Sequence, residues 1–301
     1  MLPQTPWVAL SRIPGIGPRT FARLVARFGS PGQVLAAPER ELIALGRLPP
    51  EMAAQIIASG QELDRLDAEL TAIAQEGIVI LTYDTPEYPT NLAACGEAPP
   101  VLFLRGQMTE ADERGVAVVG TRSPTRAASK AAEQIAQGLA AQGVTVVSGL
   151  AIGVDTAAHR AALAAGGRSM AVLGSGLRRL YPQRNLRLSD RIASRGAVLS
   201  EVMPDTTVSA ENLLARNRTI AGLSRAVVVV QSQARGGAIV AAQHTRDFGR
   251  PVFCLDWPEA RFHEAAQQLL AMGGTLLPSP ADLGPLLEAA ECEPTRQEGL
   301  W

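Results

Sequence analysis

The sequence VSGLAIGVDTAAH, residues 147–159, passes from a β-strand through a glycine-containing turn into a helix. The valines that lead into it are typical of a buried parallel strand, and Gly149 and Gly153 allow a tight turn. Asp155 or Thr156 is expected to cap the helix that follows. Free backbone N–H groups at the start of a helix form a site for an anion, commonly a phosphate. The same pattern also fits an ordinary tight turn, so the rest of the chain has to decide between the two interpretations.

The pattern of this stretch recurs along the centre of the chain. Short apolar runs rich in β-branched residues alternate with segments of helical spacing, such as residues 129–143 and 155–167. Repeated strand–helix units predict an α/β fold with a doubly wound, mostly parallel, extended Rossmann-like sheet. Ligands of such sheets bind beyond the carboxyl ends of the strands, so functional residues are expected directly after each strand. The expected strands cover residues 115–120, 144–149, 169–174, 197–201, 226–231 and 251–256.

Residues 1–75 differ from the centre because their apolar residues fall at helical spacing. The turn IPGIGP, residues 13–18, lies between two helical segments and resembles a helix-hairpin-helix, whose glycine-rich turn offers N–H groups to a nucleic-acid phosphate. Residues 45–56 resemble a weaker second copy, and such a pair would be typical of a small SAM-like helical domain. Seven basic and seven acidic residues up to Gln75 favour a role in interaction or orientation over strong DNA binding.

The net charge of −1 hides a strongly basic central segment. Residues 115–250 contain 17 Arg and Lys against 7 Asp and Glu, a balance of +10, whereas the rest of the chain has 11 basic and 22 acidic residues. Such asymmetry is typical of a protein that binds a polyanion. An arginine-rich solvated face is the simpler alternative, but it does not explain why acidic residues are scarce in the same segment.

Composition also excludes several classes of protein. The chain has no apolar run of membrane-spanning length and no secretory signal, so we expect no membrane association and a cytoplasmic location. Three scattered cysteines form neither a disulfide framework nor a metal-binding pattern, which predicts no metal site and no cofactor. The dinucleotide fingerprint and the phosphate-binding loop of ATPases are both absent. Glu201 is the best candidate acid, but no base or nucleophile accompanies it, so we expect no catalytic residues.

Glycine and arginine recur in the segments that follow the predicted strands. Arg suits bidentate contact with phosphate, and this many arginines indicate a groove that follows several phosphates. Tyr181 and Phe248 are the only aromatic residues between positions 115 and 250, so base stacking is limited and binding is expected to be sequence-tolerant and salt-sensitive. Arg216, Asn217 and Arg218 are expected at the start of a helix. The predicted nucleic-acid-binding residues are Arg122, Ser148, Gly149, Gly153, Arg178, Arg179, Tyr181, Asn185, Arg216, Asn217, Arg218, Arg235, Gly236 and Gly237.

The motifs VVGTR, VVSGLAIGVDTAAHRAAL, AVLGSGL, LSE and RNRTIAGLS, in this order, resemble the DNA-processing protein A family, also called DprA or Smf. The resemblance runs from about Tyr83 to Leu277 and includes the segment YPTNLAACGEAPPVLFLRG. It implies a non-enzymatic, single-stranded DNA-binding homodimer that protects incoming DNA in natural transformation and recombination. It also implies that the protein loads a RecA-type recombinase and meets a single-strand-binding protein. By position, the family's DNA pocket corresponds to Arg122, Ser148, Gly149 and the Arg216–Arg218 trio, whereas the residue 178–185 loop is added from charge.

We therefore expect three parts. These are a SAM-like/helix-hairpin-helix domain over residues 1–75, an extended Rossmann-like DNA-binding domain over residues 76–280, and a polar C-terminal tail over residues 281–301. The alternative function is a nucleotide-processing hydrolase on a related Rossmann-like sheet, such as a nucleoside-monophosphate phosphoribohydrolase. That family requires a PGGxGT loop near a catalytic Glu, and RGGAIVAA, residues 235–242, keeps only the paired glycines. An interaction scaffold is a third possibility, against which the basic segment argues.

Overall fold

The structure, a computed structural model, describes residues 1–293, and its first part is entirely helical. The glycine turn IPGIGP connects the first two helices, and Gly29, at φ 98°, ends the second. Proline stands in the first turn of several of these helices, where its missing N–H would have no intrahelical partner. The helices are α1 (Thr5–Ser11), α2 (Pro18–Phe28), α3 (Pro31–Ala36), α4 (Glu39–Ala44), α5 (Pro50–Gln61) and α6 (Leu63–Gln75).

Within residues 1–293 the strands form one nine-stranded sheet, in the order β1-β2-β6-β5-β4-β3-β7-β8-β9. β1 and β2 pair antiparallel, as do β2 and β6, and all other pairs are parallel. The mostly parallel, doubly wound sheet is therefore confirmed, with every predicted strand present. The strands are β1 (Val79–Thr82), β2 (Val101–Gly106), β3 (Val116–Val119), β4 (Val146–Ser148), β5 (Ser169–Leu173), β6 (Ala197–Ser200), β7 (Ala226–Val229), β8 (Val252–Cys254) and β9 (Thr275–Leu276).

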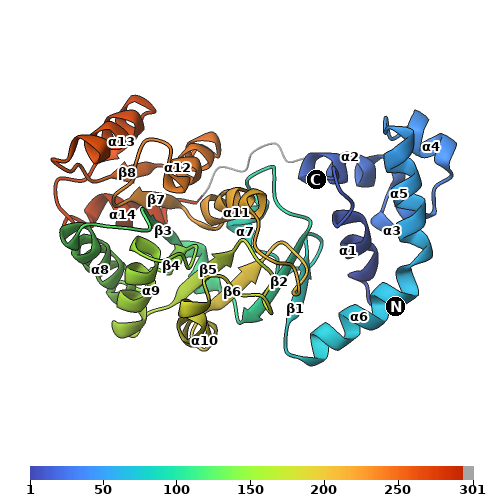
Figure 1. Cartoon of the computed structure of the whole chain (residues 1–301), viewed down its shortest axis with the longest axis horizontal. Helices are drawn as coiled ribbons and strands as arrows, with labels where there is room; N and C mark the ends of the chain where they lie inside the picture. The colour runs from blue at the N-terminus through green and yellow to red at the C-terminus, as the bar shows by residue number, and fades with distance from the viewer. Residues whose placement is uncertain (294–301) are drawn as a thin grey trace.

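Helices cover both faces of the sheet because successive residues of its strands point to opposite sides (Figure 1). Val116 and Val118 pack against α8 (Arg126–Ala141), α9 (Val154–Ala164) and α14 (Gly284–Glu291). Ala117 and Val119 share a core with α7 (Thr90–Ala93), α11 (Ala210–Leu223), α12 (Gly237–Asp247) and α13 (Ala260–Ala271). The remaining elements are α10 (Leu186–Ala193) and two 3-10 turns, η1 (Glu110–Arg114) and η2 (Gln183–Asn185).

The expected polar tail over residues 281–301 needs correction. Residues 284–291 form α14, whose Leu286, Ala289 and Ala290 are buried against the sheet. Their i, i+3, i+4 spacing makes one apolar helix face. The prediction missed this face because the segment is short and contains acidic residues. Residues 294–301, the rest of that tail, lie outside the described residues.

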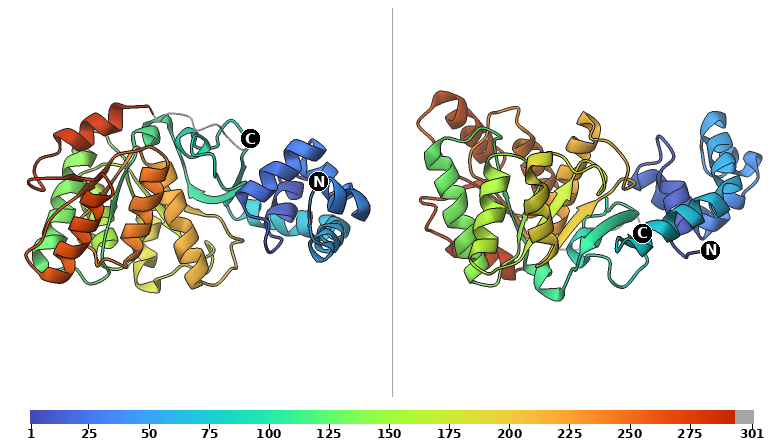
Figure 2. Two further views of the ribbon diagram at one scale, coloured as in Figure 1. Left: turned by 90° about the horizontal axis from the view of Figure 1, so that it is seen from above. Right: turned by 60° about the horizontal axis from the view of Figure 1, so that its bottom comes forward.

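The helical segment lies at one end of the molecule, beyond β1 and β2 (Figures 1 and 2). One hydrophobic cluster joins the two parts, since Leu10 and Phe21 belong to the same buried group as Ile80 and Phe103. In the part of the chain that is described, no helix combines the length and apolar character needed to cross a membrane.

Candidate nucleic-acid interface

The strand order reverses between β3 and β7, and a cavity of about 570 Å³ lies at their carboxyl ends. From β3 the chain continues to β4 on one side, while β7 and β8 extend the sheet on the other. Open α/β sheets bind ligands at such a switch point. The predicted site residues that line this cavity are Arg122, Arg216, Asn217, Gly236 and Gly237.

The turn of residues 147–159 is held together from within. Gly153, at φ 90°, is the N-cap of α9, so the expected cap at Asp155 or Thr156 is wrong. The buried Asp155 carboxylate instead accepts hydrogen bonds from the N–H groups of Gly149 and Ala151, at 3.1 and 3.3 Å. Burial raises the pKa of Asp155, and the nearby Arg216 charge and these two amides oppose that rise. The Gly149 amide is therefore already bonded to protein and is not a free phosphate donor.

His159 supports the same turn. Its Nε2 accepts a hydrogen bond from the N–H of Leu150, at 3.3 Å, and Leu150 has the rare φ of 58°. Its Nδ1 lies 2.7 Å from the hydroxyl of Ser169, which donates its own proton to the carbonyl of Val146. This network requires the proton on Nδ1, and burial together with the charge of Arg216 lowers the pKa of His159 to about 3. The interpretation of His159 as a packed, hydrogen-bonded residue is confirmed.

Arg216 is a buried cation against the glycine turn. Its Nη1 donates to the carbonyl of Val172, at 3.1 Å, and only 8% of the residue is exposed. A Cβ atom on Gly149 would lie 1.1 Å from Nη1, so glycine is what leaves room for the guanidinium. The Nε of Arg216 has no hydrogen-bond partner among the described residues. A buried N–H without a partner is costly, and a bound anion can supply one.

Three cavities meet at Arg216. It lines the 570 Å³ cavity, a second of about 280 Å³ and a third of about 190 Å³. Burial lowers the pKa of Arg216, the Asp155 carboxylate opposes this, and the charge of Arg122 adds to the lowering. The exposed Arg122 lines the first two cavities, so two guanidinium groups face the same space.

The second cavity brings the loop after β5 to the glycine turn. Tyr181, which is 44% exposed, lines it together with Gly149 and Arg184. Arg184 belongs to the residue 178–185 loop that was added from charge, although it is not among the individually predicted binding residues. Arg122 and Arg216 line this cavity as well. An aromatic ring beside arginines can stack on a nucleic-acid base while the arginines bind the phosphates.

The 216–218 trio does not lie at the start of a helix, as expected, but in the middle of α11. The reason is the N-cap Ser209, whose side chain accepts from the N–H of Asn212 and starts the helix at Ala210. From this start, positions 210, 213, 214 and 217 fall at helical spacing, and all four line the first cavity. Ala210, Leu213 and Leu214 are thus wall residues that sequence reasoning missed.

Several predicted residues have partners within the protein. Asn185 is buried and donates to the Leu150 carbonyl and the Thr156 hydroxyl, at 2.9 and 2.8 Å. Ser148 is buried too and donates to the Val118 carbonyl. Both residues stabilise the turn and are not exposed to a ligand.

The other predicted arginines divide into paired and exposed side chains. Arg178 pairs with Glu76 at 2.7 Å and with Asp205 at 2.5 Å, and the exposed Arg179 reaches Asp205 at 3.9 Å. Arg218 pairs with Glu201 at 2.9 Å and lines the third, smallest cavity, which Gly17 of the helical segment also lines. Arg235 is exposed in the loop before α12. No group of His, Cys, Asp and Glu within residues 1–293 is arranged to hold a metal ion.

Comparison with known proteins gives matches over nearly the whole chain. A family model described as "DNA recombination-mediator protein A" matches residues 79–287, and a "DprA-like N-terminal HHH domain" matches residues 4–41. The protein Smf of Synechocystis is 36% identical over 307 residues, which cover 96% of this chain and 75% of that protein.

Two solved structures are similar to this fold. The structure of DNA processing protein A from Streptococcus pneumoniae has a TM-score of 0.75 and 30% identity, covering 92% of this chain and 94% of that one. The structure from Helicobacter pylori, described as giving insight into a unique single-stranded DNA binding mode, has a TM-score of 0.62 and 27% identity. It covers 69% of this chain and 96% of that one.

Proposed function

Because this chain belongs to the DNA recombination-mediator protein A family, we propose that it binds single-stranded DNA in the cavities around Arg216. The observation that carries this proposal is a buried guanidinium at the junction of three cavities, two of which the exposed Arg122 also lines. The relative from Helicobacter pylori, whose structure is described by its single-stranded DNA binding mode, supports the same ligand.

Phosphate contact is expected to supply most of the affinity. Arg216 offers a desolvated charge, and Arg122 adds a flexible, exposed one across the same cavity. Charge-assisted hydrogen bonds from Arg to phosphate are stronger than neutral ones. Tyr181, in the second cavity, is placed to stack on a base, which only an unpaired strand can present freely.

A binding role suits the site better than hydrolysis. Glu201, the candidate acid, pairs with Arg218 and accepts a hydrogen bond from the Thr219 hydroxyl. His159 is committed to the turn through both ring nitrogens. These contacts engage the two residues that the alternative nucleotide hydrolase would most readily use, and Asp155, the carboxylate that lines the cavity, accepts hydrogen bonds from Gly149 and Ala151.

The family name describes a recombination mediator, and from the resemblance of the sequence motifs we further propose a more specific role. The protein protects incoming single strands and loads a RecA-type recombinase in natural transformation and recombination. It acts as a homodimer alongside single-strand-binding protein. We also propose a cytoplasmic location, which the scattered and odd-numbered cysteines of the sequence support.

A fluorescence anisotropy titration with a labelled dT oligonucleotide tests the site at two salt concentrations. Arg122→Ala is expected to weaken binding several-fold and to lower the salt slope by about 0.7, the contribution of one single-strand phosphate contact. Arg195→Ala is the matched control, because Arg195 is exposed just before β6, at the opposite end of the sheet.

Two results would contradict the proposal. One is an Arg122→Ala variant whose affinity and salt slope both equal those of the wild type and of Arg195→Ala. The other is release of free base from nucleoside monophosphates by the purified protein, which would favour the hydrolase.

A further inference from the structure

The turn between α1 and α2 borders the proposed DNA site. The smallest of the three cavities at Arg216, of about 190 Å³, is lined by Arg216 and Arg218 of α11 and by residues 16–18 of this turn. We call it the junction cavity. The helical segment therefore contributes to the walls around Arg216, although almost 200 residues of chain separate the two.

The turn brings free backbone N–H groups to the junction cavity. Gly17, which lines the cavity, is the N-cap of the 11-residue helix α2, and no side chain caps this helix. Within residues 1–293, neither the N–H of Gly17 nor that of Arg19, in the first turn of α2, donates a hydrogen bond. Such N–H groups and the helix dipole together favour an anion at the start of a helix.

A buried cation lines the same cavity. Arg216 is only 8% exposed, and its Nε has no hydrogen-bond partner among the described residues. The charge of Arg218 is balanced by Glu201, which also lines the cavity. An anion in the junction cavity would therefore meet the guanidinium of Arg216 and the start of α2, which come from two different parts of the chain.

The unit that carries the turn is entirely basic. Residues 1–38 contain four arginines and no Asp or Glu, whereas residues 39–75 contain three arginines and seven acidic residues. The even charge balance of the helical segment therefore conceals a basic first half. This half includes α1, the turn and α2.

Three of these arginines form one face of α2. Arg19, Arg23 and Arg27 are four residues apart and exposed, whereas Phe21 on the other side is buried. Arg19 pairs with Glu97, in the segment before β2, so this face begins next to the sheet. Neither Arg23 nor Arg27 forms an ion pair within residues 1–293. Both charges are therefore available to a ligand.

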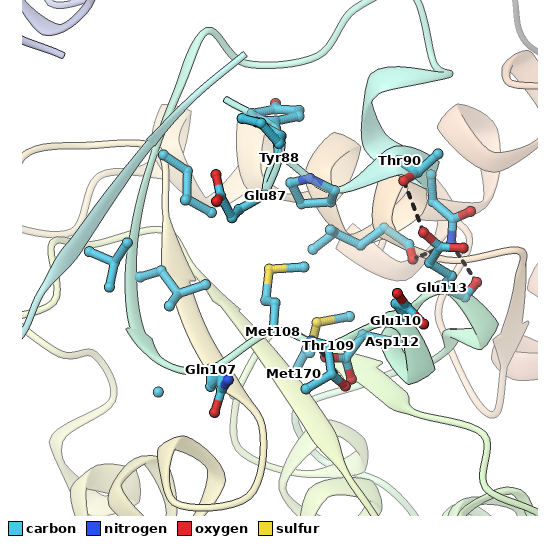
Figure 3. A pocket seen from close by; sticks show the side chains of 18 residues that line it. Glu87, Tyr88, Thr90, Gln107, Met108, Thr109, Glu110, Asp112, Glu113 and Met170 are labelled. Carbon is cyan, nitrogen blue, oxygen red and sulfur yellow. Dashed lines mark hydrogen bonds between the residues drawn. The ribbon is translucent and has the colours of Figure 1, made fainter. Parts of the chain in front are cut away.

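The pocket at the opposite ends of the strands has the contrary charge. It has a volume of about 440 Å³ and reaches Met170 at the beginning of β5, and Figure 3 shows Glu87, Glu110 and Glu113 around it. Among the described residues, no Arg or Lys lines this pocket. Its carboxylates repel phosphate, so α2 offers a DNA strand a basic surface that this end of the sheet does not.

We propose that the α1–α2 turn and the arginine face of α2 extend the DNA site, so that a strand leaving Arg216 crosses the junction cavity and continues along α2. One phosphate binds at the N–H groups of Gly17 and Arg19, and the following phosphates bind at Arg23 and Arg27. This inference rests on the proposed function, because the strand has to occupy the cavities around Arg216. The added contacts reach only the DNA backbone, so they raise affinity and salt dependence without sequence preference.

Gly17→Asp tests the turn. A Cβ atom on Gly17 would meet no heavy atom within 4 Å, its φ is an ordinary −78°, and Asp is a preferred N-cap residue. The variant should therefore fold as stably as the wild type while placing a carboxylate where the phosphate binds. Anisotropy with labelled dT20 should show at least 10-fold weaker binding. Gly17→Ala, the matched variant without a charge, should stay within 2-fold of the wild type.

Arg23→Ala combined with Arg27→Ala tests the helix face. Loss of two phosphate contacts should weaken dT20 binding several-fold and lower its salt slope by about 1.4, at about 0.7 for each contact. The matched double variant, Arg40→Ala with Arg65→Ala, removes the same charge from exposed positions of the same helical segment, on α4 and α6. It should leave both the affinity and the salt slope unchanged.

Strand length separates this site from the cavities around Arg216. A dT6 strand, measured by competition, should bind the Arg23/Arg27 variant as tightly as the wild type, because it is held by the cavities around Arg216 alone. Wild-type dT20 affinity in either Gly17→Asp or the Arg23/Arg27 variant would overturn the inference, as would equal weakening by the two members of either matched pair. These results leave the effect of Arg122→Ala on dT6 intact, whereas failure of the proposed function removes that effect.

Discussion

Acidification is expected to loosen the glycine turn through His159. The pKa of His159 is about 3 in the folded protein, against an ordinary 6.5, because the ring is buried beside Arg216. The unfolded chain therefore binds a proton first as the pH falls. The stabilisation is complete above pH 6.5 and is lost progressively between pH 6.5 and pH 3. One pKa unit corresponds to about 1.4 kcal/mol, so lowering the pH from 7 to 5 should reduce the free energy of unfolding by about 2 kcal/mol through this residue.

Urea unfolding followed by circular dichroism at pH 7, 6 and 5 measures this loss. The variant His159→Gln keeps one donor and one acceptor but cannot titrate, so its free energy of unfolding should fall about 2 kcal/mol less over the same range. His263→Gln serves as the control, since His263 is half exposed and pairs with Asp256 on the surface, and it should behave like the wild type. If wild type and His159→Gln lose the same stability between pH 7 and pH 5, the buried neutral imidazole is refuted.

Four further substitutions separate binding from support. Gly149→Ala should displace the Arg216 guanidinium and weaken dT binding at least 10-fold, which anisotropy measures; unchanged affinity would contradict the packing described. In Gly153→Ala the added Cβ would lie 2.4 Å from the carbonyl oxygen of Thr121, at a φ of 90° that side chains rarely adopt. The variant should therefore lose about 1–3 kcal/mol of unfolding free energy in urea, and wild-type stability would argue against this turn. Asn185→Ala removes two hydrogen bonds of a buried side chain and should also cost about 1–3 kcal/mol of unfolding free energy, while the free energy of DNA binding changes by less. Arg178→Ala breaks exposed ion pairs, so unfolding should change by less than about 1 kcal/mol and dT affinity by less than 2-fold; a larger loss of affinity would return Arg178 to the DNA site.

The fold was largely predictable because its signals are local. Each central strand is a short β-branched run, and each is followed by a glycine turn or a helix of clear spacing. β9 was missed because it has two residues, Thr275 and Leu276, both exposed, and so carries no burial pattern. The position of β1 and β2 in the sheet could not be predicted from the sequence either, because β2 pairs with β6, almost 100 residues later in the chain.

The candidate site was predicted less completely, because the presence of an arginine in the sequence does not reveal whether a carboxylate of the same chain pairs with it. Arg178 and Arg218 were chosen as phosphate ligands, yet they pair with Glu76 and Glu201, 102 and 17 residues away. The role of Gly149 was also different from that expected. It was thought to expose an amide, and instead it makes room for the buried side chain of Arg216.

The internal bonding of the glycine turn has an entropic consequence. Asp155, His159 and Asn185 fix this wall of the cavity before any ligand arrives, so the protein has little backbone freedom left to lose there. The ordering cost of binding then falls mainly on the nucleic acid. The free-energy cost of adopting the bound conformation is smaller for a flexible strand such as poly-dT than for poly-dA, whose bases must first unstack. Affinity at this site should therefore follow the stiffness of the strand more than the identity of its bases.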